Sequence, residues 1–359
     1  MEEMPICKKI KSILKLLTEM IIVVLTSYTI YLSLTSGIEF KTTYAVTTIL
    51  INSLLLLLRI ALLLKKNEVL KTLSKLSAFR NGLQNKSQIP LRKYAILASC
   101  LTLLLPLVMV ISSTVELLIN IDKFSSIYLH ADQNSTWDRK LCLALFMASF
   151  STVYMMHYIA FPGLVIVLLS FVYLTFVKTF QQHLEAMRLR LLERFSKDEI
   201  SKSLAIFTAV KNIHLNIEKS MQLFSFLAYV LIFSNILQMI SGIVTSFMSN
   251  KGMGNFIITS TTLGFIIIWF IALTLCGAQV EKTEVFLRNM SQDIITKNFG
   301  DEIDGHKNLV YMNLFNACAD FELRFTGCGM FVVDKKLFLP VTGIMVTYGV
   351  LFATEVSKI

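Results

Sequence analysis

Long apolar runs alternate with charged segments along the whole chain. Seven runs are long enough to cross a bilayer as helices, because a hydrocarbon core of about 30 Å needs about 20 apolar residues. No charged residue occurs between 221 and 248 or between 255 and 280. Such unbroken runs favour helices over barrel strands, in which apolar and polar residues alternate. The pattern predicts an all-α membrane protein, one domain over 1–359, with spans near 16–36, 42–64, 94–120, 141–177, 221–248, 255–280 and 330–356.

The fourth run is the one whose number of helices is ambiguous. Residues 141–177 contain no Asp, Glu, Lys or Arg, and Pro162-Gly163 lies within them. Two spans would need about 40 residues and a turn, so the run is too short for two. We expect one long helix, kinked at Pro162 and extending beyond the bilayer on one side.

The distribution of Lys and Arg predicts the orientation of the helices. Four lie in the N-terminal tail, eight in 65–93, eight in 178–220 and seven in 281–336, which is 27 of 34 on one side, against six on the other. Basic residues concentrate on the cytoplasmic side, so we expect a cytosolic N-terminus and an extracellular C-terminus. A glycosylation sequon at Asn134, in the loop after the third run, agrees with this orientation. Arg59 lies inside the second run near its basic end, where it is expected to snorkel.

Composition narrows the class of protein further. Hydrophobic residues make up 55% of the 359 positions and charged ones 16%, and mean hydropathy is +0.65. A soluble chain carries about 25% charged residues, so we exclude a soluble enzyme, a disordered chain and a nucleic-acid binder. No motif or spacing typical of catalysis, metal binding or cofactor binding occurs. The net charge of +10 follows from the basic segments flanking the spans, and the expected surroundings are a lipid bilayer.

The segments 178–220 and 281–329 have helical periodicity on the predicted cytosolic side. Apolar residues recur at three- and four-residue intervals through both segments, up to Phe325. We expect these helices to extend spans four and seven into the cytosol and to pack together as an anchor region. The alternative is a basic surface lying against anionic lipid.

Polar residues within the apolar runs are the candidate binding residues. Intramembrane ionisable groups are costly and mark functional sites, and many of the polar residues fall in the outer half of different spans. If they converge, they form an outward-facing pocket for a small molecule. The alternative is that they only join helices by hydrogen bonds. The candidate ligand-binding residues are Glu116, Tyr154, His157, Asn235, Gln238 and Thr48.

The last span combines polar and apolar positions on one helical stripe. Thr347, Leu351 and Thr354 share one face, and Tyr348 and Glu355 share the adjacent face. The stripe suits a helix that lines a water-filled path shared between subunits. The alternatives are helix packing by small residues and an interfacial Glu355 paired with Lys358.

The C-terminal region resembles a known receptor family. The chain has Phe325-Thr326-Gly327, then Asp334 and Leu337, then Gly343 and Thr347-Tyr348. This is similar to the end of arthropod gustatory receptors, in the gustatory and odorant receptor superfamily, whose seventh span carries the motif TYxxxxxQF. Here Thr354-Glu355 stands where that family has Gln-Phe, a position close to the channel gate.

The resemblance implies a function. Members of that superfamily are homo- or heterotetrameric ligand-gated cation channels of the plasma membrane. Their seventh spans surround the pore, their inner helices form the subunit anchor, and each subunit binds a small tastant or odorant in an outward-facing pocket. The residues themselves leave two alternatives open, a secondary transporter and a metabotropic receptor of inverted seven-span topology. The sequence names no particular tastant, whether sugar or bitter compound.

Overall fold

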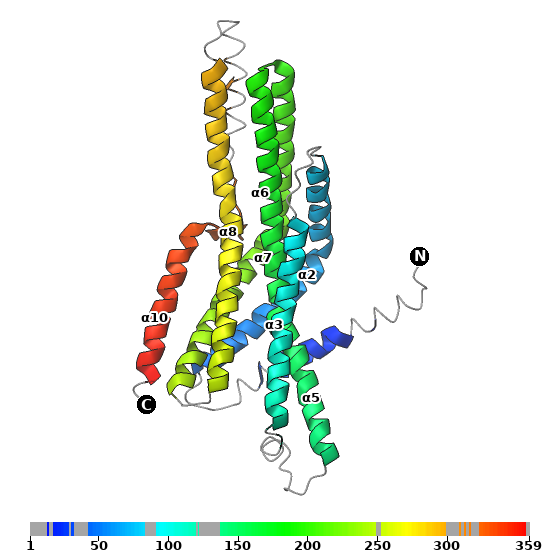
Figure 1. Ribbon diagram of the computed structural model, residues 1–359, viewed down its shortest axis with the longest axis vertical. Coiled ribbons are helices and arrows are strands. Elements are labelled where there is room, and N and C mark those ends of the chain that lie inside the picture. The colour runs from blue at the N-terminus through cyan, green and yellow to red at the C-terminus, as the bar shows by residue number, and fades with distance from the viewer. Residues whose placement is uncertain are drawn as a thin grey trace.

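A computed structural model of the chain describes residues 13, 17–28, 30–31, 42–82, 91–119, 121, 137–248, 253–298, 309, 312–313, 316 and 323–356. Nearly all of these residues are helical, which confirms the all-α fold class (Figure 1). The main elements are α2 (Thr42–Asn81), α3 (Leu91–Ile119), α5 (Trp137–Met155), the π-helical turn η2 (Met156–Ala160), α6 (Phe161–Glu193), α7 (Lys197–Met248), α8 (Met253–Asn298) and α10 (Phe338–Val356). A short hairpin, β1 (Thr326–Gly327) and β2 (Phe331–Val332), precedes α10.

Five helices in the described ranges are long and apolar enough to cross a membrane. They correspond to the second through sixth apolar runs. The first run contains a shorter apolar helix, Leu17–Tyr28, and the last contains α10, which has 19 residues. The helices therefore follow the apolar runs of the sequence, and the orientation of the bundle in a membrane stays a prediction.

The fourth run forms one continuous helical path from Trp137 to Glu193. Its irregular point is η2, which ends just before Pro162. Proline lacks an N–H and clashes with the carbonyl four residues earlier in a regular helix. A π-helical turn changes that register and accommodates the ring, so the irregularity expected at Pro162 lies one turn before it.

The helix α7 is the central element of the bundle. It packs against α2, α6, α8, α10 and the hairpin strand β1. Buried apolar side chains occur along most of its 52 residues, from Ile200 to Ile236. The neighbouring helices bury part of their apolar surface against α7, and apolar residues such as Leu57 of α2 and Ile268 of α8 stay exposed on the outside of the chain, as expected for helices that contact lipid.

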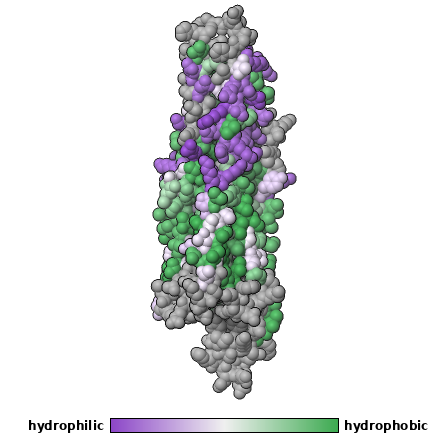
Figure 2. All heavy atoms as spheres, turned by 90° about the vertical axis from the view of Figure 1, so that its left-hand side faces the viewer, coloured by the Kyte–Doolittle hydropathy of each residue, from purple (hydrophilic) through white to green (hydrophobic). Residues whose placement is uncertain are grey.

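One end of the bundle is rich in charge. Figure 2 shows hydrophilic residues over one half of the viewed face and hydrophobic residues over the other. Here α6 ends at Glu193 and α7 begins at Lys197, so the two form a helical hairpin, and Arg188 of α6 pairs with Asp293 of α8 at 2.7 Å. The helices extended at this end belong to runs two, four, five and six. The expectation that span seven is extended in the same way concerns residues mostly outside the described ranges.

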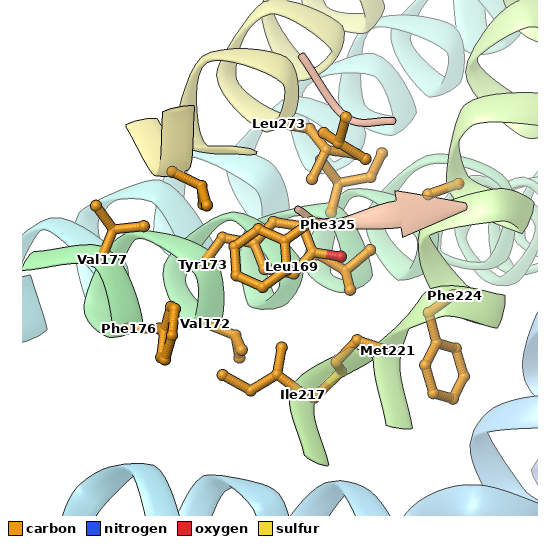
Figure 3. Close-up of a cluster of buried hydrophobic side chains, with 14 of the residues drawn as sticks. Leu169, Val172, Tyr173, Phe176, Val177, Ile217, Met221, Phe224, Leu273 and Phe325 are labelled. Atoms are coloured by element: carbon orange, nitrogen blue, oxygen red, sulfur yellow. The ribbon is translucent and has the colours of Figure 1, made fainter. Parts of the chain in front are cut away.

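Aromatic side chains fill the core of this charge-rich half. The rings of Tyr173 and Phe325 stack with centroids 3.9 Å apart, and Phe176 meets Phe325 edge-on at 5.8 Å (Figure 3). His214 of α7 lies 5.5 Å from the Phe325 ring. Tyr173, Phe176 and Phe325 are at most 1% exposed. Residues far apart in sequence therefore hold α6, α7 and the segment before β1 together.

The hairpin corrects two expectations from the sequence. Residues 323–332 are not helical, although the periodicity through Phe325 predicts a helix up to 329, and the last helix begins at Phe338, not at 330. Cys328 and Gly329 have φ angles of 52° and 72°. That left-handed conformation interrupts a helix and closes a tight turn. The side chain of Asp334 then accepts from the Lys336 N–H and caps the turn leading into α10.

Candidate functional site

A hydrogen-bonded network connects three elements in the half of the bundle opposite the charge-rich end. Gln238 of α7 donates from Nε2 to Thr48 Oγ1 of α2 at 2.9 Å, and the Tyr158 hydroxyl of η2 donates to Gln238 Oε1. Gln238 is 5% exposed. Both ends of its carboxamide are thus paired across helices, as buried polar groups require. The ring of Tyr154 stacks on Tyr158 with centroids 5.4 Å apart.

A small pocket lies beside this network. Tyr158 and Asn235 supply two of its polar wall residues, and most of the others are apolar. Its free space is about 20 Å³, enough for about one water molecule. A larger molecule can enter only if wall side chains move. The wall residues come from α3, η2, α6, α7 and α8: Leu105, Tyr158, Ile159, Pro162, Ile166, Leu231, Ile232, Asn235, Thr262, Phe265, Ile266 and Trp269.

Gly163 allows three helices to approach closely next to the pocket. A Cβ at this position would lie 2.4 Å from Cζ2 of Trp269 and 2.5 Å from Cγ2 of Thr102. Glycine therefore leaves the space that the Trp269 indole of α8 and the Thr102 methyl of α3 occupy. This indole is part of the pocket wall, and it can take its position only because residue 163 has no side chain.

We expect Gly163→Ala to destabilise the protein by about 1–3 kcal/mol, because the added methyl overpacks a filled site. The measurement is the midpoint of thermal unfolding of purified protein in detergent. The matched control is Gly264→Ala in α8, where a Cβ would have nothing within 4 Å. Alanine there should be neutral or slightly stabilising. Equal midpoints for the two variants would contradict the close approach at Gly163.

A charged cluster lies elsewhere in the same bundle. Arg59 of α2 pairs with Glu19 at 2.7 Å, and its guanidinium carbon lies 4.6 Å from the centroid of the Phe161 ring. Arg59 Nη2 also lies 3.3 Å from His157 Nδ1. The side chains of Arg59 and Glu19 are only 15% and 28% exposed. Arg59 is therefore held inside the bundle by an ion pair and does not snorkel, which corrects the expectation from sequence.

The hydrogen bonds determine the protonation state of His157. Arginine can only donate, so His157 Nδ1 accepts and the ring proton lies on Nε2. Nε2 is 3.4 Å from Thr26 Oγ1, and the Thr26 hydroxyl donates to the Ile22 carbonyl at 2.6 Å. A neutral imidazole with its proton on Nε2 fits these contacts, while Arg59 Nε is buried without a hydrogen-bond partner among the described residues. The cluster thus joins the helix Leu17–Tyr28 to α2 and η2 at the π-helical turn.

The structure brings some of the predicted binding residues together and separates others. Thr48, Gln238 and Tyr154 belong to or adjoin the network, and Asn235 lies in the pocket wall. His157 faces the charged cluster. The side chain of Glu116 lies outside the described residues, as does Asn134.

Sequence reasoning missed three members of these sites, namely Glu19, Tyr158 and Trp269. A signal existed for Glu19 and Arg59, because opposite charges in the first two apolar runs are candidates for pairing. Tyr158 follows Tyr154 by one helical turn, a spacing that places both on one face. No pattern in the sequence distinguishes Trp269 as a wall residue.

The predicted pore residues lie on an exposed side of α10. Thr347, Tyr348, Leu351 and Thr354 are all exposed in the single chain, and α10 packs on α7, with Val341 2% exposed. The side chain of Glu355 lies outside the described residues. A mixed threonine and apolar face thus points away from the helix that supports α10.

The hairpin connects α10 to the charge-rich half of α7. Glu218 of α7 accepts from the N–H and the hydroxyl of Thr326, and His214 Nε2 lies 2.8 Å from the carbonyl oxygen of Arg324. The oxygen is an acceptor, so His214 donates from Nε2. The two α7 side chains are one turn apart; Glu218 binds the first residue of β1, and His214 binds Arg324 just before that strand. These hydrogen bonds attach the segment before α10 to this part of α7.

Comparison with known proteins identifies the fold. No protein-family model matches the sequence, and a search of curated proteins finds no match. Among solved structures, the chain is similar to the insect olfactory receptor OR5 from Machilis hrabei, with a TM-score of 0.60 and 12% identity over 92% of this chain and 87% of that one. For the structure of the same receptor in complex with eugenol, the TM-score is 0.59 and the identity 11%, over 96% of this chain and 90% of that one. The chain thus shares the fold of an insect olfactory receptor over nearly its whole length.

Proposed function

We propose that the chain is a ligand-gated cation channel of the plasma membrane that acts as a taste receptor for small molecules. The observation that carries the proposal is the similarity of fold to an insect olfactory receptor over 92% of the chain. The Thr347-Tyr348 motif and the neighbouring residues that resemble gustatory receptors favour taste over smell. The eugenol-bound structure of the similar receptor makes small organic molecules the first ligands to test.

The pocket supports a ligand-binding role for each subunit. It lies between α3, η2, α6, α7 and α8, and its polar wall residue Tyr158 connects it to the Gln238 network. Ligand sites are typically apolar cavities with a few convergent polar groups. With only about 20 Å³ free, the pocket is contracted, so ligand entry moves wall side chains. Some of these side chains belong to α7, which packs against α10, and to α8, which packs against the turn before α10.

The exposed face of α10 supports a pore shared between subunits. Leu351 is 56% exposed and Val346 62% in the single chain, although the helix is otherwise attached to α7. We propose that four subunits place their α10 helices around one axis, with Thr347, Leu351 and Thr354 toward the path. Four copies of Glu355 then form a carboxylate ring that favours cations.

The experiment that tests this function is whole-cell recording from cells that express only this chain. A channel gives ligand-evoked currents that reverse with the cation gradient and start without a signalling cascade. A secondary transporter gives small currents coupled to substrate uptake, and a metabotropic receptor gives none in excised patches. Currents that disappear on patch excision, at full surface expression, would reject the channel.

The same proposal predicts the orientation in the membrane. With 27 basic residues on one side and six on the other, a C-terminal tag should be reached by antibody on intact cells and an N-terminal tag only after permeabilisation. Asn134→Gln should shift the electrophoretic mobility of the protein as deglycosylation does. Surface labelling of the N-terminal tag would reverse the orientation.

A further inference from the structure

Asn235 presents an unpaired hydrogen-bond acceptor at the pocket. Its side chain lies in the pocket wall and the residue is 7% exposed. Nδ2 donates to the Leu231 carbonyl of the same helix at 2.9 Å. Oδ1 is buried and has no hydrogen-bond partner among the residues that the structure describes.

A buried acceptor without a partner is unfavourable for a folded protein. Burial removes its hydrogen bonds to water, and nearly all buried polar groups in native proteins have partners. The hydroxyls of the wall do not pair with this acceptor, since Tyr158 donates to Gln238 and the Thr262 hydroxyl lies 3.8 Å from the Met109 sulfur. The remaining wall is mostly apolar. No described wall residue donates to Asn235 Oδ1, so the donor comes from a water or from a ligand that replaces that water in the pocket.

We propose that Asn235 Oδ1 is the specificity-determining acceptor of this pocket, and that it selects small, largely apolar molecules carrying a hydroxyl group. The inference rests on the proposed function, because it names the ligand class of the same pocket. A ligand needs only one hydrogen-bond donor, because Asn235 Oδ1 is the single unpaired acceptor among the described wall residues. Apolar wall residues such as Ile166 and Phe265 accommodate the hydrocarbon part of the ligand.

Asn52 provides a matched control. It is 0% exposed, its Nδ2 donates to the Thr48 carbonyl at 2.8 Å, and its Oδ1 is also buried without a partner in the described part of the chain. It is not among the pocket wall residues. Asn235→Leu and Asn52→Leu thus remove the same chemical groups from two helices, and only one of them changes the pocket.

The test uses alcohols paired with their methyl ethers, namely phenol with anisole and 1-hexanol with 1-methoxyhexane. Whole-cell currents and thermal unfolding of the purified protein are measured for each. We expect the wild type to respond to each alcohol at about tenfold lower concentration than to its ether, since one lost hydrogen bond leaves Asn235 unpaired. The difference should disappear in Asn235→Leu and persist in Asn52→Leu.

Each outcome decides one of the two claims. Equal sensitivity of the wild type to alcohol and ether overturns the role of Asn235 and leaves the channel intact. Selective thermal stabilisation by the alcohols without any current keeps the role of Asn235 and overturns the channel. Neither currents nor stabilisation with any of the four compounds overturns the proposed ligand class. Loss of alcohol preference in both variants assigns the effect to general packing and also overturns the inference.

Discussion

Glu19→Ala is expected to lower the stability of the folded protein by about 3 kcal/mol, because it leaves Arg59 charged and unpaired inside the bundle. The value is at the lower end for a broken buried pair, since the two side chains are 15% and 28% exposed. The remaining neighbours of Arg59 are the neutral His157 and the Phe161 ring. The measurement is the thermal midpoint of the tagged protein in detergent, followed by gel filtration.

The matched control removes both charges together. Glu19→Leu combined with Arg59→Met replaces the pair by apolar groups, which is often neutral for stability. We expect the double variant to unfold at a higher temperature than either single variant. A single Glu19 variant as stable as the wild type would contradict the ion pair.

Phe325→Ala is expected to remove about 3–5 kcal/mol of stability, the usual loss for a buried Phe. Its ring is 1% exposed and lies between Tyr173, Phe176 and His214. The substitution also weakens the attachment of the hairpin, so we expect ligand-evoked current per surface subunit to fall strongly. Thermal unfolding and recordings normalised to surface protein measure the two effects.

Met330 provides the control for this prediction. It lies at the tip of the same hairpin and is 72% exposed, so Met330→Ala should change neither stability nor current. Unchanged current in a folded Phe325→Ala protein would show that the hairpin does not link α7 to α10 in gating.

The helices within the apolar runs could be predicted from sequence because about 20 consecutive apolar residues determine a membrane-length helix. The ends of the helices in the charge-rich half could not be found in this way. The helix α2 continues past the run 42–64 to Asn81, and its buried residues there are Val69, Thr72 and Leu76. These residues form a narrow stripe in a charged segment, and they are buried because α2 packs against α7 there. Mean hydropathy along the sequence does not reveal such a contact.

The candidate site was predictable as a set of polar residues but not as a geometry. Thr48 and Gln238 are 190 positions apart, and their hydrogen bond follows from how α2 packs on α7. His157 points instead to Arg59, because the π-helical turn changes the angular position of its residues. The pairing of Arg59 with Glu19 likewise depends on the packing of the first helix. The position of Arg59 in its apolar run therefore predicted only that its side chain snorkels.

A pore formed by the last helix is tested by single-channel recording from the purified chain in a planar bilayer. We expect unitary, ligand-dependent cation currents that a thiol reagent blocks in Thr354→Cys, because this residue lies on the proposed pore face of α10. The same reagent should have no effect on Met330→Cys at the hairpin tip. Absence of unitary currents from folded, ligand-stabilised protein, or equal effects of the reagent on the two variants, would contradict a pore formed by the last helix.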